Sequence, residues 1–302
     1  MSNQKAIEIR GLVKNYGRVK ALKGVDLDVN CGEIFGFLGP NGAGKTTAIR
    51  CMLDLIRPQN GSISMLGINP QEEPEAVKER VGYLPGELHV DENMTARQVF
   101  HFFNRLRGNR SDWGFIEELS ERLKLELISP IKNFSKGNKQ KIGIVQALMH
   151  KPELLLLDEP TSSLDPLMQQ EVLRMLAEAQ DNGATVFFSS HIISEVQAVA
   201  DRVAIIREGK IVEVAVTADL LHRSMRQVRI RFQQPTEAEE LYKLPGVELI
   251  AKDDSMGILL QVEGQMDVLI KTLAKYPVND FETERTSLEE IFLAYYNGEE
   301  DK

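Results

Sequence analysis

The sequence predicts an α/β protein built on a parallel sheet, followed by a smaller α+β domain. Residues 34–38 are typical of a strand, and a glycine-rich turn joins them to a helix that starts at about Thr46. Residues 154–157 are four consecutive leucines, as expected of a strand that is buried on both faces. After residue 216 short strands and helices alternate in a different order. We therefore expect one domain at residues 1–215 and a second at residues 216–302.

Composition and charge exclude several classes of protein. Of the 302 residues, 42% are hydrophobic and 27% are charged, as in ordinary globular proteins. A net charge of −9 argues against binding nucleic acid through overall positive charge. The two cysteines, Cys31 and Cys51, make no disulfide framework, which favours a reducing cytoplasm. No apolar run is long enough to span a bilayer, so any work at a membrane needs a second, spanning chain.

The glycine-rich turn has the spacing of a P-loop and stands between a strand and a helix, as that motif requires. Its glycines let successive backbone N–H groups face inward, where they and the helix N-terminus can hold phosphate oxygens. Lys45 can reach the β- and γ-phosphates, and the Thr46 hydroxyl is placed to ligate Mg²⁺. A nucleoside triphosphate is the predicted ligand. The residues predicted to bind it are Gly39, Pro40, Asn41, Gly42, Ala43, Gly44, Lys45, Thr46 and Thr47.

Two acids, Asp158 and Glu159, follow the buried leucine strand. Buried carboxylates are costly unless they have a function. Beside a P-loop, Asp158 can hold Mg²⁺ through its water shell and Glu159 can polarise the attacking water. His191 follows the next buried strand, at residues 185–189, where it can contact or sense the γ-phosphate. The alternative is that the acids cap the next turn and that the histidine is structural.

Residues 88–150 are rich in helical patterns and predict a helical subdomain inserted between two strands. Within the helix expected at 95–107, Val99, Phe100, Phe103 and Leu106 share one face. Ser135 is placed as the N-cap of a helix that runs to Leu148, so this helix offers free N–H groups and a positive dipole end to an anion. A simple capped helix in the core is the alternative.

The second domain reads as βαββαβ plus a terminal helix, which is the ferredoxin-like arrangement. It shows no cluster of catalytic or metal-binding residue types, so regulation or dimerisation is favoured over chemistry. The expected strands are 228–232, 247–252, 257–262 and 278–284, and the expected helices are 236–243, 266–275 and 287–296.

The ordered series of motifs over roughly residues 5–215 resembles the ATP-binding subunit of an ABC transporter. The resemblance implies that Tyr16 stacks on adenine, that Glu159 is the catalytic base and that His191 is the switch histidine. It also implies a head-to-tail homodimer with ATP and Mg²⁺ between the subunits. Residues of one chain would then complete the ATP site of the other. These residues are Ser135, Lys136, Gly137, Asn138 and, in the loop that links the opposed subunits, Asp165.

Two positions depart from the motifs of that family. The signature is usually Leu-Ser-Gly-Gly-Gln, and here only Ser135 and Gly137 match it, so we expect the phosphate contact to be retained. The family's glutamine after Gly-Tyr-Leu-Pro is replaced by Gly86, with Glu87 next. We hypothesise that Glu87 or a water takes over the Mg²⁺ and water contact of that glutamine.

The motifs around residues 82–87 and 135–141, and the C-terminal segment 287–296, resemble the type-two exporter branch, which includes drug and antibiotic exporters. The resemblance implies a peripheral subunit at the cytoplasmic face of the cell membrane that drives an integral membrane partner through ATP-dependent dimer closure and opening. Phe100, Phe102 and Phe103 are candidates for the contact with that partner, or for the core. The alternatives are a soluble mechanical or regulatory ATPase and a low-turnover nucleotide sensor. One motif set disfavours the first, and Glu159 with His191 disfavours the second.

Overall fold

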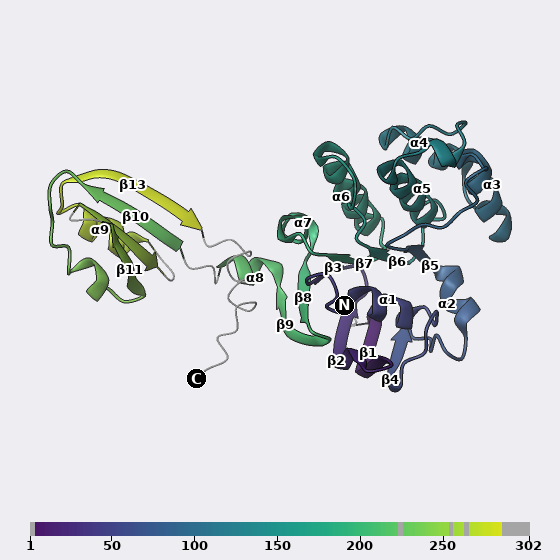
Figure 1. Ribbon diagram of the computed structural model, residues 1–302, viewed down its shortest axis with the longest axis horizontal. Helices are drawn as coiled ribbons and strands as arrows, with labels where there is room; N and C mark the ends of the chain where they lie inside the picture. Colours follow the sequence, from purple (N-terminus) through teal and green to yellow (C-terminus); the bar gives the residue numbers. More distant parts are fainter. Residues whose placement is uncertain (1–3, 223–225, 254–255, 263–265, 286–302) are drawn as a thin grey trace. The chain divides into compact units, whose positions relative to one another are not determined.

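The chain forms two compact units, Met1–Ala215 and Val216–Lys302. The structure is a computed structural model that describes residues 4–222, 226–253, 256–262 and 266–285 (Figure 1). Each unit has a hydrophobic core of its own, as separately folded domains do.

A six-stranded sheet in the order β5-β6-β7-β3-β8-β9 forms the centre of the first unit. The four pairs from β5 to β8 are parallel. Every residue of β3, β6 and β7 is buried, which explains the apolar runs at 34–38, 154–157 and 186–188. The strands of this sheet are β3 (Ile34–Leu38), β5 (Val81–Leu84), β6 (Leu154–Asp158), β7 (Thr185–Ser190), β8 (Arg202–Arg207) and β9 (Lys210–Val216).

Other helices and strands of the first unit pack on both faces of this sheet (Figure 1). On one face lie α1 (Lys45–Met52) and an antiparallel sheet in the order β2-β1-β4, and the core between them includes Ile7, Phe35, Ile49 and Phe187. The strands of the antiparallel sheet are β1 (Lys5–Tyr16), β2 (Val19–Asn30) and β4 (Asn60–Met65). On the other face lie α5 (Lys136–Leu148), α6 (Pro166–Asp181) and α7 (Ile193–Val199).

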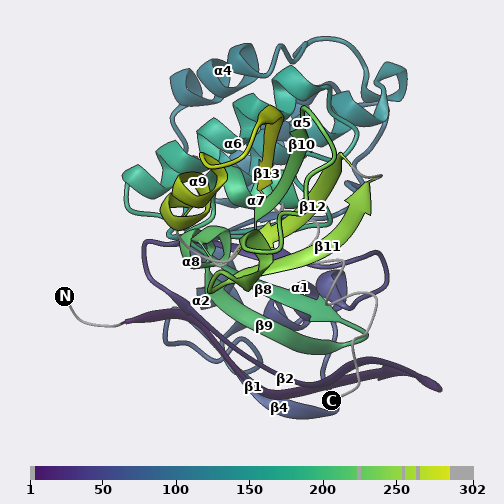
Figure 2. The same cartoon turned by 90° about the vertical axis from the view of Figure 1, so that its left-hand side faces the viewer.

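Both views place α5 between α4 and the central sheet (Figures 1 and 2). The helix expected at 95–107 forms as α3 (Ala96–Leu106). Phe100 is fully buried, whereas the side chain of Leu106, in the last turn, is 67% exposed. The remaining helical elements of this unit are α2 (Pro74–Arg80), α3 (Ala96–Leu106), α4 (Trp113–Arg122) and the 3₁₀ turn η1 (Ile131–Asn133).

The second unit contains an antiparallel sheet in the order β11-β12-β10-β13. The helix expected at 236–243 is wrong, because only the 3₁₀ turn η2 (Leu241–Lys243) forms there. Pro245 disfavours helical backbone at Leu244, which is extended, so the turn ends at Lys243. The helix expected at 287–296 lies outside the described residues. The other elements are α8 (Thr217–His222), β10 (Arg226–Phe232), β11 (Val247–Asp253), β12 (Gly257–Val262), α9 (Asp267–Leu273) and β13 (Val278–Arg285).

His150, which follows α5, is held as a neutral ring. Its Nε2 lies 3.3 Å from the carbonyl oxygen of Val81, which can only accept, so Nε2 is the protonated nitrogen. Its Nδ1 is buried and has no partner among the described residues. Burial, and then the nearby charge of Arg107, lower the pKa of His150 to about 4 from 6.5.

We predict that this histidine makes the first unit less stable as the pH falls from about 7 toward 4. In that window the unfolded chain binds a proton that the folded chain does not bind. Between pH 7 and pH 5 the wild type should lose about 1–2 kcal/mol more stability than His150→Gln, which keeps a donor for Val81 and does not titrate. Urea midpoints at the two pH values measure this difference. Equal losses in both proteins would contradict the prediction.

Candidate active site

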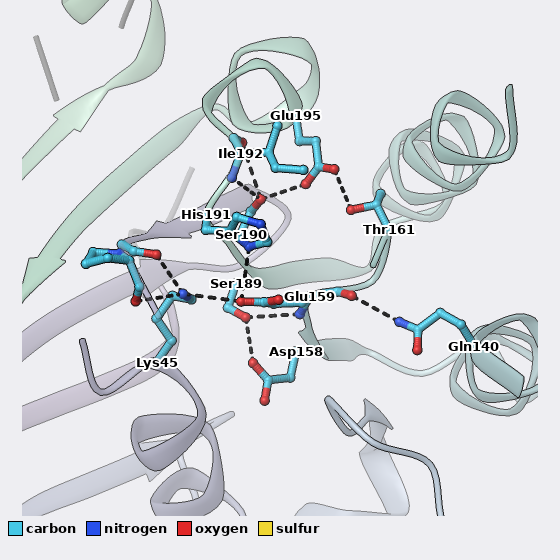
Figure 3. A network of polar contacts seen from close by, with 12 residues as sticks. Lys45, Gln140, Asp158, Glu159, Thr161, Ser189, Ser190, His191, Ile192 and Glu195 are labelled. Carbon is cyan, nitrogen blue, oxygen red and sulfur yellow. Dashed lines mark hydrogen bonds and ion pairs between the residues drawn. The ribbon is translucent and has the colours of Figure 1, made fainter. Parts of the chain in front are cut away.

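The predicted site residues follow the ends of four neighbouring strands. The P-loop follows β3, the acids follow β6, His191 follows β7, and Gly86 with Glu87 follows β5. These strands are parallel neighbours in the order β5-β6-β7-β3, so their carboxyl ends meet at one edge of the sheet. Segments that are far apart in the sequence therefore form one site (Figure 3).

The P-loop glycines are required by packing as well as by backbone conformation. Gly42 and Gly44 have φ angles of 81° and 113°, in the region that favours glycine. An alanine Cβ at Gly39 would lie 2.4 Å from the carbonyl oxygen of Ile206, and one at Gly44 would lie 2.7 Å from that of Ala21. The loop therefore lies directly against the backbones of β8 and β2, and α1 begins immediately after it.

Lys45, Glu159 and His191 meet at a single carboxylate oxygen (Figure 3). The side chain of Lys45 is only 5% exposed, and its Nζ donates to the carbonyl oxygens of Gly39 (2.6 Å) and Pro40 (3.1 Å). The same Nζ lies 3.3 Å from Oε1 of Glu159. His191 Nδ1 also lies 3.3 Å from that oxygen. The three residues predicted to be catalytic are thus within reach of one small group, such as a phosphate.

The backbone of Glu159 is held in a rare conformation. Its φ angle is 51°, which is unfavourable for a residue with a side chain. Its N–H donates to Ser189 Oγ at 3.0 Å, and its carbonyl oxygen accepts from Gln140 Nε2 at 3.0 Å. Neither Ser189 nor Gln140 is among the site residues predicted from the sequence. A polar residue in a buried segment could have indicated them: Ser189 lies near the end of a buried strand, and Gln140 lies within a packed helix.

Asp158 is placed to offer one carboxylate oxygen to a cation. Its side chain is 1% exposed, and Oδ1 accepts from Ser189 Oγ at 2.7 Å. Oδ2 is buried and has no hydrogen-bond partner among the described residues. Hard cations such as Mg²⁺ are commonly held by one or two protein oxygens together with phosphates, so Asp158 and the Thr46 hydroxyl fit such an ion. Both residues line a pocket of about 330 Å³ together with Arg50, Gly86, Glu87, His89 and Glu159.

A second pocket, of about 360 Å³, runs along the P-loop. Part of its wall comes from β2, through Val19, Lys20, Ala21 and Lys23, which the sequence analysis does not single out. Tyr16, at the end of β1, is 46% exposed and is not among the residues that line this pocket. Its ring contacts the ammonium of Lys14, 5.4 Å from the ring centre. Stacking of Tyr16 on a base therefore stays a prediction.

The residues predicted to act on a second subunit begin two helices of their own chain. Ser135 caps α5, and its Oγ accepts from the N–H of Asn138 at 3.2 Å. Gly137 lies so close to the next loop that an alanine Cβ would be 2.6 Å from the carbonyl oxygen of Ser163. Asp165 caps α6 by accepting from the N–H groups of residues 167 and 168. Lys136 is exposed in the first turn of α5.

A buried carboxylate joins the loops that follow β6 and β7 (Figure 3). Glu195, in α7, is 5% exposed and accepts from Thr161 Oγ1 at 2.5 Å and from Ser190 Oγ at 2.6 Å. Ser190 Oγ also accepts from the N–H of Ile192, so this hydrogen bond joins the residues before and after His191. The position of the His191 loop is thus tied to that of the loop after Glu159.

Comparison with known proteins gives matches in both units. A family model described as ABC transporter matches residues 22–162. A second model, described as the C-terminal domain of DrrA1-3-like ATP-binding proteins, matches residues 217–296. Among solved structures, one titled as the ATP-binding subunit of an ABC transporter is 29% identical, with a TM-score of 0.65, over 71% of this chain and 91% of that one. A dimeric bacterial ABC transporter cassette, at 21% identity and a TM-score of 0.64, covers 70% of this chain and 98% of its own, and it shares the fold.

Curated relatives cover most of their own length in the match. The bacitracin transport ATP-binding protein of Enterococcus faecalis is 37% identical over 73% of this chain and 72% of its own length. The daunorubicin/doxorubicin resistance ATP-binding protein of Streptomyces peucetius is 31% identical over 96% of this chain and 92% of its own length. The chain therefore belongs to the ATP-binding proteins of ABC transporters, a family of ATPases that couple the hydrolysis of ATP to transport.

Proposed function

We propose that this chain is the ATP-hydrolysing subunit of a drug or antibiotic exporter. The observation that supports this most directly is the position of the Glu159 carboxylate, 3.3 Å from both Lys45 Nζ and His191 Nδ1. A carboxylate at the carboxyl edge of the sheet can accept a proton from the water that attacks the γ-phosphate. The Lys45 ammonium can stabilise the negative charge that develops on the phosphate oxygens, and His191 can contact the same phosphate.

The P-loop and the start of α1 provide the phosphate site, because their N–H groups and the helix dipole favour an anion. Thr46 and Asp158 would hold Mg²⁺, which neutralises charge on the β- and γ-phosphates when it is bound. Glu87 lines the same pocket as Asp158, so a contact between Glu87 and the ion through water fits the proposal. The base would lie beside the turn between β1 and β2. Tyr16, at the end of β1, is the predicted stacking residue.

ABC ATPase domains pair as dimers, and we propose that two copies of this chain close on two ATP molecules. Ser135, Lys136, Gly137 and Asn138 lie in or beside the first turn of α5, so they can present N–H groups and a hydroxyl to the γ-phosphate on the opposite P-loop. The phosphate charge is stabilised better by the P-loop of one chain together with the first turn of α5 of the other than by either alone. ATP therefore favours the closed dimer. Hydrolysis and phosphate release remove that difference, and the dimer opens.

We predict that Glu159→Gln abolishes steady-state ATP hydrolysis, by about a hundredfold or more, and leaves ATP binding intact, because the base is lost while the P-loop is unchanged. With ATP, this variant should elute as a dimer in size-exclusion chromatography. Glu87→Ala tests the proposed role of Glu87 separately: a fall in activity would support its contact with the ion through water, and unchanged activity would show that it is dispensable for hydrolysis. Hydrolysis that survives in Glu159→Gln would remove Glu159 from the mechanism, and a wild type without turnover would favour the sensor alternative.

We further propose that the chain works at the cytoplasmic face of the membrane with an integral membrane partner. Among the described residues, no helix has the length and apolarity of a membrane span. Of the three candidate contact residues, Phe100 belongs to the core, since it is fully buried in α3. Phe102 is 51% exposed and its ring contacts that of Phe103, with 5.6 Å between centroids. This aromatic pair, in which Phe102 is exposed and Phe103 is partly buried, is the site that we propose for the contact.

Phe102→Ser should therefore leave the fold and the ATPase activity of the isolated chain unchanged but reduce co-purification with the membrane partner about tenfold, because a central aromatic contact is lost. Ile270→Ser is the matched control, since Ile270 is also 51% exposed and lies on α9 of the second unit instead. Quantitative pull-down from detergent-solubilised membranes measures the effect. Unfolding of Phe102→Ser, or equal loss in both variants, would remove Phe102 from the interface.

The names of the relatives suggest the class of transported substrate. We propose a compound related to bacitracin, daunorubicin or doxorubicin, because the relatives are named for these compounds. Expression of this chain with its membrane partner should raise the inhibitory concentration of one such compound several-fold, and expression of Glu159→Gln should not, because export needs hydrolysis. Equal resistance with the wild type and with Glu159→Gln would show that the resistance does not depend on ATP hydrolysis by this chain.

A further inference from the structure

We infer that Gln140 is a positioning residue for ATP hydrolysis, because its side-chain amide holds the backbone of Glu159 and links it to the helix that faces the second subunit. The inference rests on the proposed roles of Glu159 and of the first turn of α5. Gln140 lines neither of the two pockets beside the P-loop.

The amide of Gln140 is directed at the loop after β6 (Figure 3). The residue is 7% exposed, and its Nε2 donates to the carbonyl oxygens of Glu159 at 3.0 Å and of Pro160 at 3.2 Å. Its neighbours in the helix include the buried Ile142 and Ile144. A buried amide among such residues is unfavourable unless it is hydrogen-bonded, and here both hydrogens of the NH₂ group have an acceptor.

Glu159 depends on this contact because its backbone is strained. A residue with φ near 51° persists only where its surroundings fix it. Ser189 holds the N–H of Glu159, and Gln140 holds its carbonyl oxygen, so the two contacts fix the peptide groups on either side of the Cα atom. The same carbonyl oxygen accepts from the N–H of Ser162 at 3.1 Å, a contact within the turn itself, whereas Gln140 joins the turn to another element, α5. Without Gln140, the peptide that joins Glu159 to Pro160 loses its contact with α5. The carboxylate would then move relative to Lys45 and His191.

Close packing makes α5 and this loop a single body. Gly137, Gln140 and Gly143 are spaced three residues apart and lie on one face of α5. An alanine Cβ would lie 2.6 Å from the carbonyl oxygen of Ser163 at Gly137, and 2.4 Å from Leu84 Cδ1 at Gly143. The first turn of α5 cannot shift on this face without moving the loop that contains Glu159. Contact of that turn with the partner's nucleotide is therefore linked mechanically to the chain's own catalytic residue.

The test compares Gln140→Leu with Gln146→Leu, the same change at a partly buried position of the same helix. We expect Gln140→Leu to lower kcat by about tenfold to a hundredfold, the cost of a catalytic group displaced by about 1 Å, and to change the KM for ATP by less than about threefold. Gln146→Leu should keep kcat near that of the wild type. Gln140→Met, which has a side chain of similar length and no amide, should behave as Gln140→Leu does and replaces it if leucine prevents folding.

A double-variant cycle separates positioning from a general loss of structure. If Gln140 acts through Glu159, then Gln140→Leu should not lower the residual single-turnover rate of Glu159→Gln any further, and Glu159→Gln/Gln140→Leu should still dimerise with ATP. An unchanged kcat in Gln140→Leu, a further fall in the double variant, or loss of its ATP-dependent dimer would overturn the inference. Failure of the proposed function would be visible separately, because Glu159→Gln alone would then keep its activity or fail to dimerise.

Discussion

The first unit is organised around an ammonium group that is almost removed from solvent. A buried ammonium is costly unless acceptors surround it, and Lys45, at 5% exposure, has three. Two are carbonyl oxygens of the P-loop after β3, and the third is the carboxylate of Glu159 after β6. In the sheet, β7 separates these two strands. The acceptors meet only because parallel neighbours end at one edge, so the order of the strands and the layers that cover both faces are conditions for this site.

The burial of a carboxylate, that of Asp158, is a second unfavourable contribution to stability in the same site. The Asp158 carboxylate is 1% exposed, yet only one of its oxygens has a hydrogen-bond donor among the described residues, namely the hydroxyl of Ser189. That hydroxyl also accepts from the N–H of Glu159, which holds a strained backbone. One serine at the end of β7 therefore orients both acids of β6. Local features that are unfavourable for stability are concentrated here, as they commonly are in functional sites.

The sequence could predict those parts of the site that depend on short motifs and on the geometry of parallel sheets. The P-loop, the acid pair and His191 are each recognisable within a few residues, and the rule for strand ends brings them together. Ser189 and Gln140 could not be found in this way, because their importance arises from contacts between distant segments. The helix expected at 236–243 shows a different limit, since only the short turn η2 forms there and the backbone is extended at Leu244, before Pro245. In α3 the helical period is right, but it does not reveal that Leu106, in the last turn, is left exposed.

Gly137, which matches the family signature, and Gly86, which replaces the family's glutamine, have different physical consequences. At Gly137 the missing side chain lets α5 lie against the backbone of Ser163, so the position is needed for packing within the chain itself. At Gly86 the missing side chain avoids a tight contact, because a Cβ there would be 3.1 Å from Oδ2 of Asp158, the oxygen that has no hydrogen-bond partner among the described residues. A residue without a side chain cannot itself hold an ion or a water through side-chain oxygens. Any link from the end of β5 to the catalytic centre must therefore run through Glu87, which lines the same pocket, or through α5, where Gly143 packs on Leu84 and Gln140 holds Glu159.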